Sequence, residues 1–476
     1  MIELGQKREV FCDDYLVDNE KTTAFQRLMH PEKKEVSFVF KNEEIKDVLM
    51  FFSILKDDKG YKLYYLDWKD GAGEPVEKRY LAVLESQDGI AWSQPDLNIY
   101  PYPEFKGHNN VVLQGADSAF VFYDENPQCP IEEKYKIVTP YYCEKPNGKA
   151  ALELWAMTSP DGYHFKLSHC IETEGHFDSL NTAHYRNGQY ACYFRSFHDR
   201  DGNDTKIWNT DNFRDIRLIT SKDFKNWSRQ QRLQYSDGMD YQLYTNNIFP
   251  YERAPHILVG FPTRYVGKKE WTDNMEQLKS ASLKKWLIKN DCSGPRAGLA
   301  ITDSVFMCSR DGVNFSRFNE AFLSCGPEEE NNWVYGDNYF AYNMIDSGRD
   351  TYYMYCMENR RSYELDKSLY RYEIRKDGFA CYMADGEEKV LVTKPLVFDG
   401  KDLHLNFSTS AFGYIYIDVL NEKGEKISED SFEIFGNTID RKIPFADGAS
   451  FEEFAGKPVR LRFRMRDAKL FSLKFE

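Results

Sequence analysis

Short runs of alternating hydrophobic and polar residues, separated by turns, make up most of this chain. The clearest unit lies between residues 178 and 228, with runs at 179–185, 190–195 and 216–220. Alternation with a period of two is typical of β-strands. The first two runs are joined by Asn187-Gly188, a pair that readily adopts the positive φ angles of a two-residue hairpin. The pattern therefore predicts a four-stranded antiparallel meander.

The same unit occurs five times. Its closing turn, Ser-x-Asp-Gly-x-x-aromatic, recurs at residues 86–92, 159–165 and 309–315, and in weaker form at 375–379. We interpret this turn as structural, because Asp and Gly both favour chain reversal. Each unit also has an aspartate ahead of its first strand-like run: Asp47, Asp117, Asp178, Asp240 and Asp337. Five four-stranded sheets repeated around an axis form a five-bladed β-propeller, which we predict for residues 1–385.

Three segments depart from the repeat. Residues 267–290, inside the fourth blade, have helical spacing and predict an insertion that serves as a lid or as an oligomer contact. Residues 386–476 alternate between apolar and polar positions with short turns, which predicts a β-sandwich. At the other end, residues 10–17 resemble a strand that closes the ring, because propellers protect their edge strands.

Composition and charge limit the classes of function that this chain can have. The 476 residues include 34 Phe, 32 Tyr and 8 Trp, which suits β-structure and stacking on sugar rings. The net charge is −14 and no block of Lys and Arg stands out, so we expect no nucleic-acid partner. The first residues lack the features of a secretory signal, and no apolar run is long enough for a membrane helix. We therefore expect a cytoplasmic protein that does not associate with membranes. The oligomeric state stays open.

The predicted fold locates the chemistry. The innermost strands of a propeller line its axis, so aspartates that precede them gather at one end of that axis. The second strands run antiparallel and end at the same face, which adds Arg195, Arg264 and Glu358. Glycoside hydrolysis needs two carboxyl groups on a concave surface, one to protonate the leaving oxygen and one to activate water or to attack. Crowded carboxylates raise the pKa of one of them, which keeps an acid protonated near neutral pH.

Three alternatives accompany this hypothesis. Any single aspartate at a strand start can simply stabilise a turn. The axial acids and aromatic residues could also bind sugars without catalysis, or hold a structural calcium ion at the propeller axis. Carboxyl groups about 5 to 9.5 Å apart across an open pocket would favour hydrolysis. Aspartates bonded to backbone amides would favour the binding or structural role.

A resemblance supports the enzymatic hypothesis. The five units, the axial acids and the appended sandwich resemble the five-bladed propeller glycoside hydrolases, the group that includes invertases, levanases and arabinanases. Segments 177–183, 254–265 and 299–307 resemble uncharacterised bacterial glycosidases of this fold. The resemblance implies acids in the first three blades, at Asp47, Asp117 and Asp178. The third-blade position, where such enzymes usually present a glutamate, is Asp178 here.

We therefore expect an exo-acting glycoside hydrolase of short oligosaccharides that needs no cofactor. Asp117 and Asp178 are the predicted catalytic pair, and Glu358 is a further candidate acid. The predicted sugar-binding residues, among which Trp333 would stack on a sugar ring, are Asp47, Asp240, Asp337, Arg195, Arg264 and Trp333.

Overall fold

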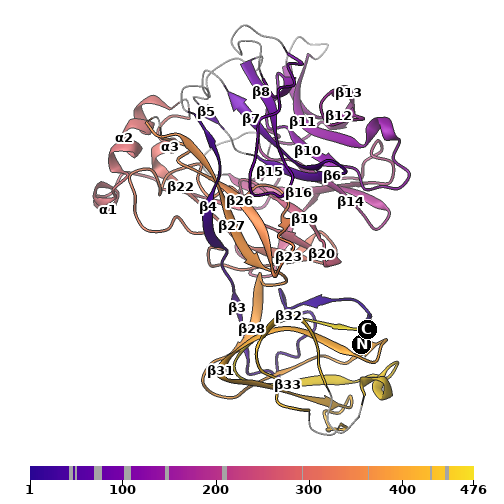
Figure 1. The fold of residues 1–476 in the computed structure, drawn as a ribbon. Helices are drawn as coiled ribbons and strands as arrows, with labels where there is room; N and C mark the ends of the chain where they lie inside the picture. Colours follow the sequence, from indigo (N-terminus) through magenta and orange to yellow (C-terminus); the bar gives the residue numbers. More distant parts are fainter. Residues whose placement is uncertain are drawn as a thin grey trace.

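The computed structural model describes residues 1–41, 47–48, 51–68, 78–100, 109–144, 150–205, 212–291, 293–362, 364–428, 431–444 and 450–476. It has two β-rich bodies (Figure 1). The upper body contains the blades and the helices, and the lower one carries both chain ends. The predicted five-bladed β-propeller followed by a C-terminal β-sandwich is confirmed.

The first three blades are antiparallel sheets whose strands follow one another along the chain. Blade one contains β5 (Asp47–Val48), β6 (Ser53–Asp57), β7 (Gly60–Trp68), β8 (Arg79–Ser86) and β9 (Val111–Gln114). Blade two contains β10 (Phe120–Tyr123), β11 (Tyr135–Glu144), β12 (Ala150–Ser159) and β13 (Lys166–Glu172). Blade three contains β14 (Thr182–Arg186), β15 (Gln189–His198), β16 (Phe213–Ser221) and β17 (Gln231–Arg232).

Blade four is more elaborate. It contains β18 (Gln234–Tyr235), β19 (Ile248–Tyr251), β20 (Ala254–Gly260), β23 (Met307–Ser309) and β24 (Asn314–Arg317). A separate strand pair, β21 (Thr263–Gly267) and β22 (Ala300–Ser304), extends from it. The segment between these two strands holds the helices α1 (Asp273–Gln277), α2 (Ala281–Asn290) and α3 (Arg296–Leu299). The amide of Met275 donates to the Thr272 hydroxyl, which caps the start of α1.

Blade five closes the ring with a strand from the start of the chain. It contains β25 (Ile345–Asp346), β26 (Thr351–Glu358), β27 (Lys367–Arg375) and β4 (Glu32–Phe40). The prediction that residues 10–17 close the ring is wrong, because β2 (Glu9–Val10) pairs with β33 (Arg460–Phe475) of the C-terminal sheet instead. The polar, half-exposed β4 suits this edge position better than the buried segment near Val10.

The C-terminal body is built around two long strands. Its seven-stranded sheet contains β2, β3 (Phe25–Leu28), β28 (Ala380–Ala384), β29 (Lys389–Val392), β31 (Leu403–Leu420), β32 (Asn437–Lys442) and β33. A second, parallel pair joins β1 (Ile2–Gly5) to β30 (Leu396–Phe398). Alternate residues of β31 and β33 are buried in a separate hydrophobic core, as the alternating sequence pattern predicts.

Buried tyrosines join neighbouring blades at the repeated closing turns. Within one such turn, the Gly312 amide donates to the Ser309 hydroxyl at 2.9 Å and the Asn314 amide donates to the Asp311 carboxylate at 2.8 Å. Tyr193 of blade three donates to the Gly312 carbonyl at 3.0 Å. Gly312 has a φ of +83°, and a Cβ there would lie 2.7 Å from the Tyr193 hydroxyl, so only glycine fits.

The same contact occurs twice more around the ring. Tyr64 of blade one donates to the Gly162 carbonyl of blade two at 2.9 Å, and Tyr355 of blade five donates to the Gly89 carbonyl of blade one. These tyrosines of the second strands therefore form specific hydrogen bonds in addition to packing in the core. Each one satisfies a turn carbonyl of the next blade.

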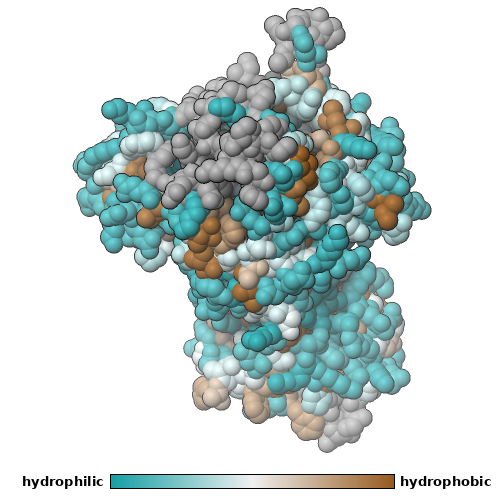
Figure 2. Space-filling view, turned by 45° about the horizontal axis from the view of Figure 1, so that its top comes forward, coloured by the Kyte–Doolittle hydropathy of each residue, from teal (hydrophilic) through white to brown (hydrophobic). Residues whose placement is uncertain are grey.

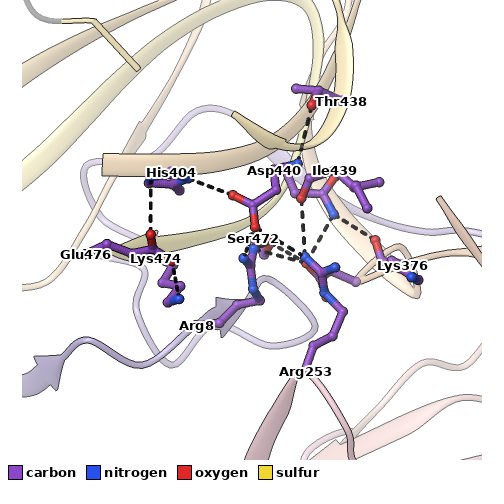
Figure 3. A network of polar contacts seen from close by, with 12 residues as sticks. Arg8, Arg253, Lys376, His404, Thr438, Ile439, Asp440, Ser472, Lys474 and Glu476 are labelled. Carbon is purple, nitrogen blue, oxygen red and sulfur yellow. Dashed lines mark hydrogen bonds and ion pairs between the residues drawn. The ribbon is translucent and has the colours of Figure 1, made fainter. Parts of the chain in front are cut away.

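A buried charge network joins the two bodies. Asp377, which is fully buried in the last closing turn, accepts from Tyr251 of blade four and from Ser472 of β33, both at 2.6 Å. Arg253 of blade four forms an ion pair with Asp377 at 3.0 Å, and Arg8 pairs with Asp440 of β32 at 2.6 Å. Figure 3 shows Arg8 and Arg253 converging on the strands of the C-terminal sheet. Because buried charges are costly unless they are paired, this network ties the bodies together.

The visible face in Figure 2 is largely hydrophilic, with hydrophobic residues in small separate groups. None of the helices in the described part of the chain is long and apolar enough to cross a lipid bilayer.

The contact between blades three and four can be tested with Tyr193→Phe. The variant leaves the buried Gly312 carbonyl without its donor, so we expect the free energy of unfolding to fall by about 1 to 3 kcal/mol. Chemical denaturation measures this change. The matched control is Tyr416→Phe, which removes a hydroxyl that donates to the exposed Glu433 and should change stability by less than about 0.5 kcal/mol. Equal effects of the two variants would contradict a stabilising role for this contact.

Candidate active site

The candidate site lies at the end of the propeller axis where the innermost strands begin. Asp117 and Asp178 stand three and four residues ahead of β10 and β14, and Asp337 precedes the inner segment of blade five. Asp47 lies in β5, where its backbone pairs with that of Trp68 in β7. The side chain of Asp47 lies outside the described residues.

A pocket of about 380 Å³ opens beside Asp178. Its walls come from blade three, from the segment ahead of β19 and from the helical insertion. The residues that line it are His176, Asp178, Arg195, Phe197, Arg214, Tyr244, Ser293 and Arg296. Two of the predicted site residues, Asp178 and Arg195, are thus brought together in one pocket.

Asp178 and Arg195 form an ion pair, with the Arg195 Nη2 donating to the carboxylate. The Arg195 Nε donates to the His176 carbonyl at 3.2 Å, which fixes the guanidinium. The two partners differ sharply in exposure, because the side chain of Arg195 is 5% exposed and that of Asp178 is 62% exposed. Burial lowers the pKa of Arg195 to about 10. The buried Arg195 thus holds the Asp178 carboxylate in place, and that carboxylate is accessible from the pocket.

A layer of aromatic rings and guanidinium groups surrounds this pair. The Arg214 guanidinium lies 4.2 Å from the Tyr265 ring centre, and the Arg361 guanidinium lies 4.9 Å from that of Tyr335. Burial raises the pKa of the Tyr335 hydroxyl, but Arg296 and Arg361 outweigh that effect and leave the pKa below its ordinary value. These guanidinium groups therefore favour a negative charge at Tyr335.

Asp117 lies on blade two, outside the residues that line the pocket. Its carboxylate accepts from the Arg79 guanidinium at 2.5 Å and from the Ser118 hydroxyl at 3.2 Å. Burial raises the pKa of this carboxyl, and the attraction of Arg79 only partly offsets the rise.

Asp337 is the most perturbed of the axial acids that the structure describes. The residue is 7% exposed, and neither carboxyl oxygen has a hydrogen-bond partner among the described residues. Burial raises its pKa to about 7, although Arg360 and Arg361 oppose the shift. A carboxyl group in this state is protonated over part of the neutral range. Asp337 is not among the residues that line the pocket.

The remaining predicted residues lie apart from the pocket. Glu358 accepts from Lys33 at 2.7 Å and from the Tyr372 hydroxyl at 2.8 Å. Arg264 forms a two-pronged ion pair with Asp303, at 2.9 and 2.6 Å. The Trp333 indole donates to the Gly326 carbonyl at 3.0 Å, in a loop beside α2.

Asp240 does not lie on the axis. It lines a neighbouring cavity of about 350 Å³ and bonds to His198 at 2.7 Å, on the flank of blades three and four. Burial lowers the pKa of His198, but its bonds to Asp215 and Asp240 raise it to about 9. The residue that precedes β19 by four positions, as Asp178 precedes β14, is Tyr244. The predicted fourth unit therefore began four residues too early.

Sequence reasoning missed several residues at this site. Tyr244 could have been found by aligning residues 178–182 with 244–248. Arg360 and Arg361 stand two and three residues after Glu358, the last residue of β26, so a slightly wider form of the rule that selected Glu358 would have included them. No comparable signal marks Arg214, on the third strand of blade three, or Arg296, in the insertion.

The axial acids do not form a metal site within the part of the chain that the structure describes. The cluster of potential ligands found there consists of Cys12, Asp13 and Cys308, whose ligand atoms lie within 4.8 Å of one another. It sits between the propeller and the N-terminal segment, where Asp13 pairs with Arg310 at 2.5 Å. A calcium ion at the axis therefore stays a prediction without a described ligand set.

Another cavity, of about 400 Å³, lies at the opposite end of the axis. It is lined by residues at the ends of the inner strands, among them Tyr123, Tyr185 and Tyr251. Because the axial aspartates precede the starts of these strands, we place the candidate site at the other end, beside Asp178.

No protein-family model matches this chain. A search of curated proteins also found no match.

Solved structures show a distant likeness. An N-acetylgalactosamine deacetylase from F. plautii is 12% identical, with 74% of this chain and 96% of that chain covered, at a TM-score of 0.46. A Bombyx mori GH32 β-fructofuranosidase is 9% identical, with coverages of 96% and 95% and a TM-score of 0.40. A family 43 arabinoxylan arabinofuranohydrolase from Bacillus subtilis is 10% identical, with coverages of 89% and 78% and a TM-score of 0.33. Glycoside hydrolases are thus among the structures that this chain resembles, at identities that concern the fold alone.

The raised pKa of Asp337 predicts a specific pH dependence of stability. Between about pH 4 and pH 7 the folded state holds a proton on Asp337 that the unfolded state has lost, so stability falls as the pH rises through this interval. Asp337→Asn removes this contribution. We expect the stability of the wild type to fall relative to the variant by up to about 1.4 kcal/mol per pH unit.

Denaturant unfolding at pH 5, 6 and 7 measures this difference. The control is Asp18→Asn. Burial raises the pKa of that carboxyl, but its bonds to Arg460 and Lys21 together leave it below the ordinary value. The stability of Asp18→Asn relative to the wild type should therefore stay constant between pH 5 and pH 7. Asp18 stabilises the folded wild type at these pH values, and this stabilisation is lost only as the pH falls below the ordinary pKa of a carboxyl group. A difference between wild type and Asp337→Asn that does not vary with pH would contradict the assignment.

Proposed function

We propose that this protein is an exo-acting glycoside hydrolase of short oligosaccharides. The observation that carries the proposal is the contrast between carboxyl groups at one end of the axis. Asp178 is exposed in a pocket and paired with an arginine, whereas Asp337 and Asp117 are buried with raised pKa values. Carboxyl groups whose environments differ in this way can divide the roles of base and acid between them.

In the proposed reaction, a protonated carboxyl group gives its proton to the glycosidic oxygen as the bond to the anomeric carbon breaks. Asp337 suits this role better than Glu358, which already accepts from Lys33 and Tyr372. Asp117 is the second candidate acid. The Asp178 carboxylate either attacks the anomeric carbon or takes a proton from the attacking water.

The size of the pocket supports exo action. Its volume of about 380 Å³ is near the lower end of the range for small-molecule sites, which suits one terminal sugar better than a long chain. Phe197 and Tyr244 offer aromatic surface in the wall, where a sugar ring can pack.

The alternative is a propeller that binds carbohydrate without catalysis. Aspartates bonded to backbone amides would have favoured it. Among the described residues, the donors to the carboxyl groups of Asp117 and Asp178 are instead the side chains of Arg79, Ser118 and Arg195. This arrangement supports the hydrolase.

The test is a screen of the purified protein against aryl glycosides and short plant and microbial oligosaccharides. We expect cleavage of at least one substrate, and a loss of at least 100-fold in kcat/KM for Asp178→Asn and for Asp337→Asn, since removing a general acid or base costs about 10² to 10⁴. Asp117→Asn distinguishes the two candidate acids.

The matched control is Asp18→Asn, which breaks an ion pair with Arg460 in the C-terminal body and should keep full activity. Circular dichroism establishes that each variant is folded. If no substrate in the panel is cleaved and sugar binding survives all of the axial substitutions, the protein is a carbohydrate-binding propeller and the hydrolase proposal is wrong.

A further inference from the structure

The pocket beside Asp178 contains more positive than negative charge. Three arginines line it, Arg195, Arg214 and Arg296, against the single carboxylate of Asp178. The chain as a whole has a net charge of −14, so this concentration of positive charge opposes the general balance. Among the described residues that line this partly desolvated pocket, cationic side chains outnumber carboxylates, which favours an anionic ligand.

Arg214 provides the strongest evidence for an anionic ligand. The residue is 4% exposed, and within the described residues no carboxylate forms an ion pair with it. Its Nη1 donates to the Gln242 side chain, whereas its buried Nε has no hydrogen-bond partner. A buried guanidinium needs its donors satisfied, and a bidentate carboxylate is the partner that matches its fork of N–H groups.

The aromatic walls hold these guanidinium groups in place. Arg195 and Arg214 lie over the same two rings, at 5.2 and 5.8 Å from the centre of Phe197 and at 5.4 and 5.9 Å from that of Tyr244. Arg296 comes from α3, and its guanidinium lies 5.8 Å from the Tyr335 ring centre. The donors are therefore fixed before a ligand arrives, which limits the entropy lost on binding.

We propose that the terminal sugar recognised by this pocket carries a carboxylate, as a uronic acid does, and that Arg214 and Arg296 bind that carboxylate. Arg195 stays with Asp178, whose carboxylate faces the sugar ring. This assignment rests on the proposed glycoside hydrolase and names its substrate class. Neutral sugars lack the group that would satisfy Arg214, so the pocket discriminates against them.

The first experiment compares charged and neutral sugars on the wild-type protein. Calorimetric titration with D-glucuronate and D-galacturonate is set beside titration with D-glucose and D-galactose. We expect at least one uronate to bind no less than tenfold more tightly than its neutral counterpart. Raising the NaCl concentration from 50 to 200 mM should weaken the binding of the uronate and leave the neutral sugar unchanged. Equal affinities for the charged and neutral members of both pairs would overturn the proposal.

Substitutions then locate the carboxylate. Arg214→Gln should reduce the preference for the uronate to about one, and Arg214→Lys should retain part of it, because the charge remains without the fork geometry. Arg296→Gln is the second variant, since α3 carries a half-buried side chain whose loss is easier to tolerate. The matched control is Arg466→Gln, which removes an arginine that lies over Phe412 in the C-terminal body and should leave the preference unchanged. A preference that survives both Arg214→Gln and Arg296→Gln would overturn the assignment.

Sodium sulfate serves as a third probe. If sulfate binds as tightly as the uronate, the pocket is a general anion site and the sugar assignment fails. Cleavage assays with p-nitrophenyl glucuronide and p-nitrophenyl glucoside separate this inference from the proposed function. Cleavage of neutral glycosides without preference for uronides would overturn the inference and leave the hydrolase in place. Tight uronate binding without cleavage of any aryl uronide would support the inference and remove the hydrolase.

Discussion

Ring closure is the constraint on which the rest of this structure depends. The last blade is complete only when β4, from residues 32–40, pairs with β27. The strands on either side of β4 in the chain do not share its surroundings, because β3 pairs with β28 in the C-terminal sheet and β5 belongs to blade one. The N-terminal segment therefore crosses both bodies, and the propeller and the C-terminal sheet are linked through it as well as through residues 375–385.

This arrangement explains why the buried charges gather at the junction. Asp377 belongs to the last closing turn, directly after β27, and its partners come from blade four and from β33. The repeated turn thus has a second use in blade five. In blades one, two and four the glycine carbonyl of this turn accepts from a tyrosine of a neighbouring blade, whereas in blade five the aspartate binds the C-terminal sheet. One repeated turn thus supplies two kinds of contact, one through its backbone and one through its carboxylate.

At the other end of the axis, burial changes the pKa values of charged residues at the candidate site. Burial raises the pKa of Asp337 and lowers that of Arg195, so each group is shifted toward its neutral form. Three guanidinium groups lie in one small pocket. Burial raises the pKa of the nearby Tyr335 hydroxyl, but one of these groups, Arg296, lowers it together with Arg361. The helical insertion packs against Val334 and contributes Arg296 to this pocket, so it forms part of the candidate site.

The sequence by itself determined the architecture and part of the site. Repeated turns and alternating strands are local patterns, and they identify the five blades, the C-terminal sandwich and the helical insertion without knowledge of contacts. The same patterns place Asp178 and Arg195 at one face, since antiparallel strands must return to it, and the two side chains do meet. Only the tertiary structure decided which strand closes the ring, because β4 and the segment near residue 10 are both plausible strands and differ in what covers them. Only the tertiary structure showed that Asp240 lines a flanking cavity and that Arg214, Tyr244 and Arg296 line the pocket. The charge and burial of a side chain depend on neighbours that are distant in the chain, and a local pattern carries no information about them.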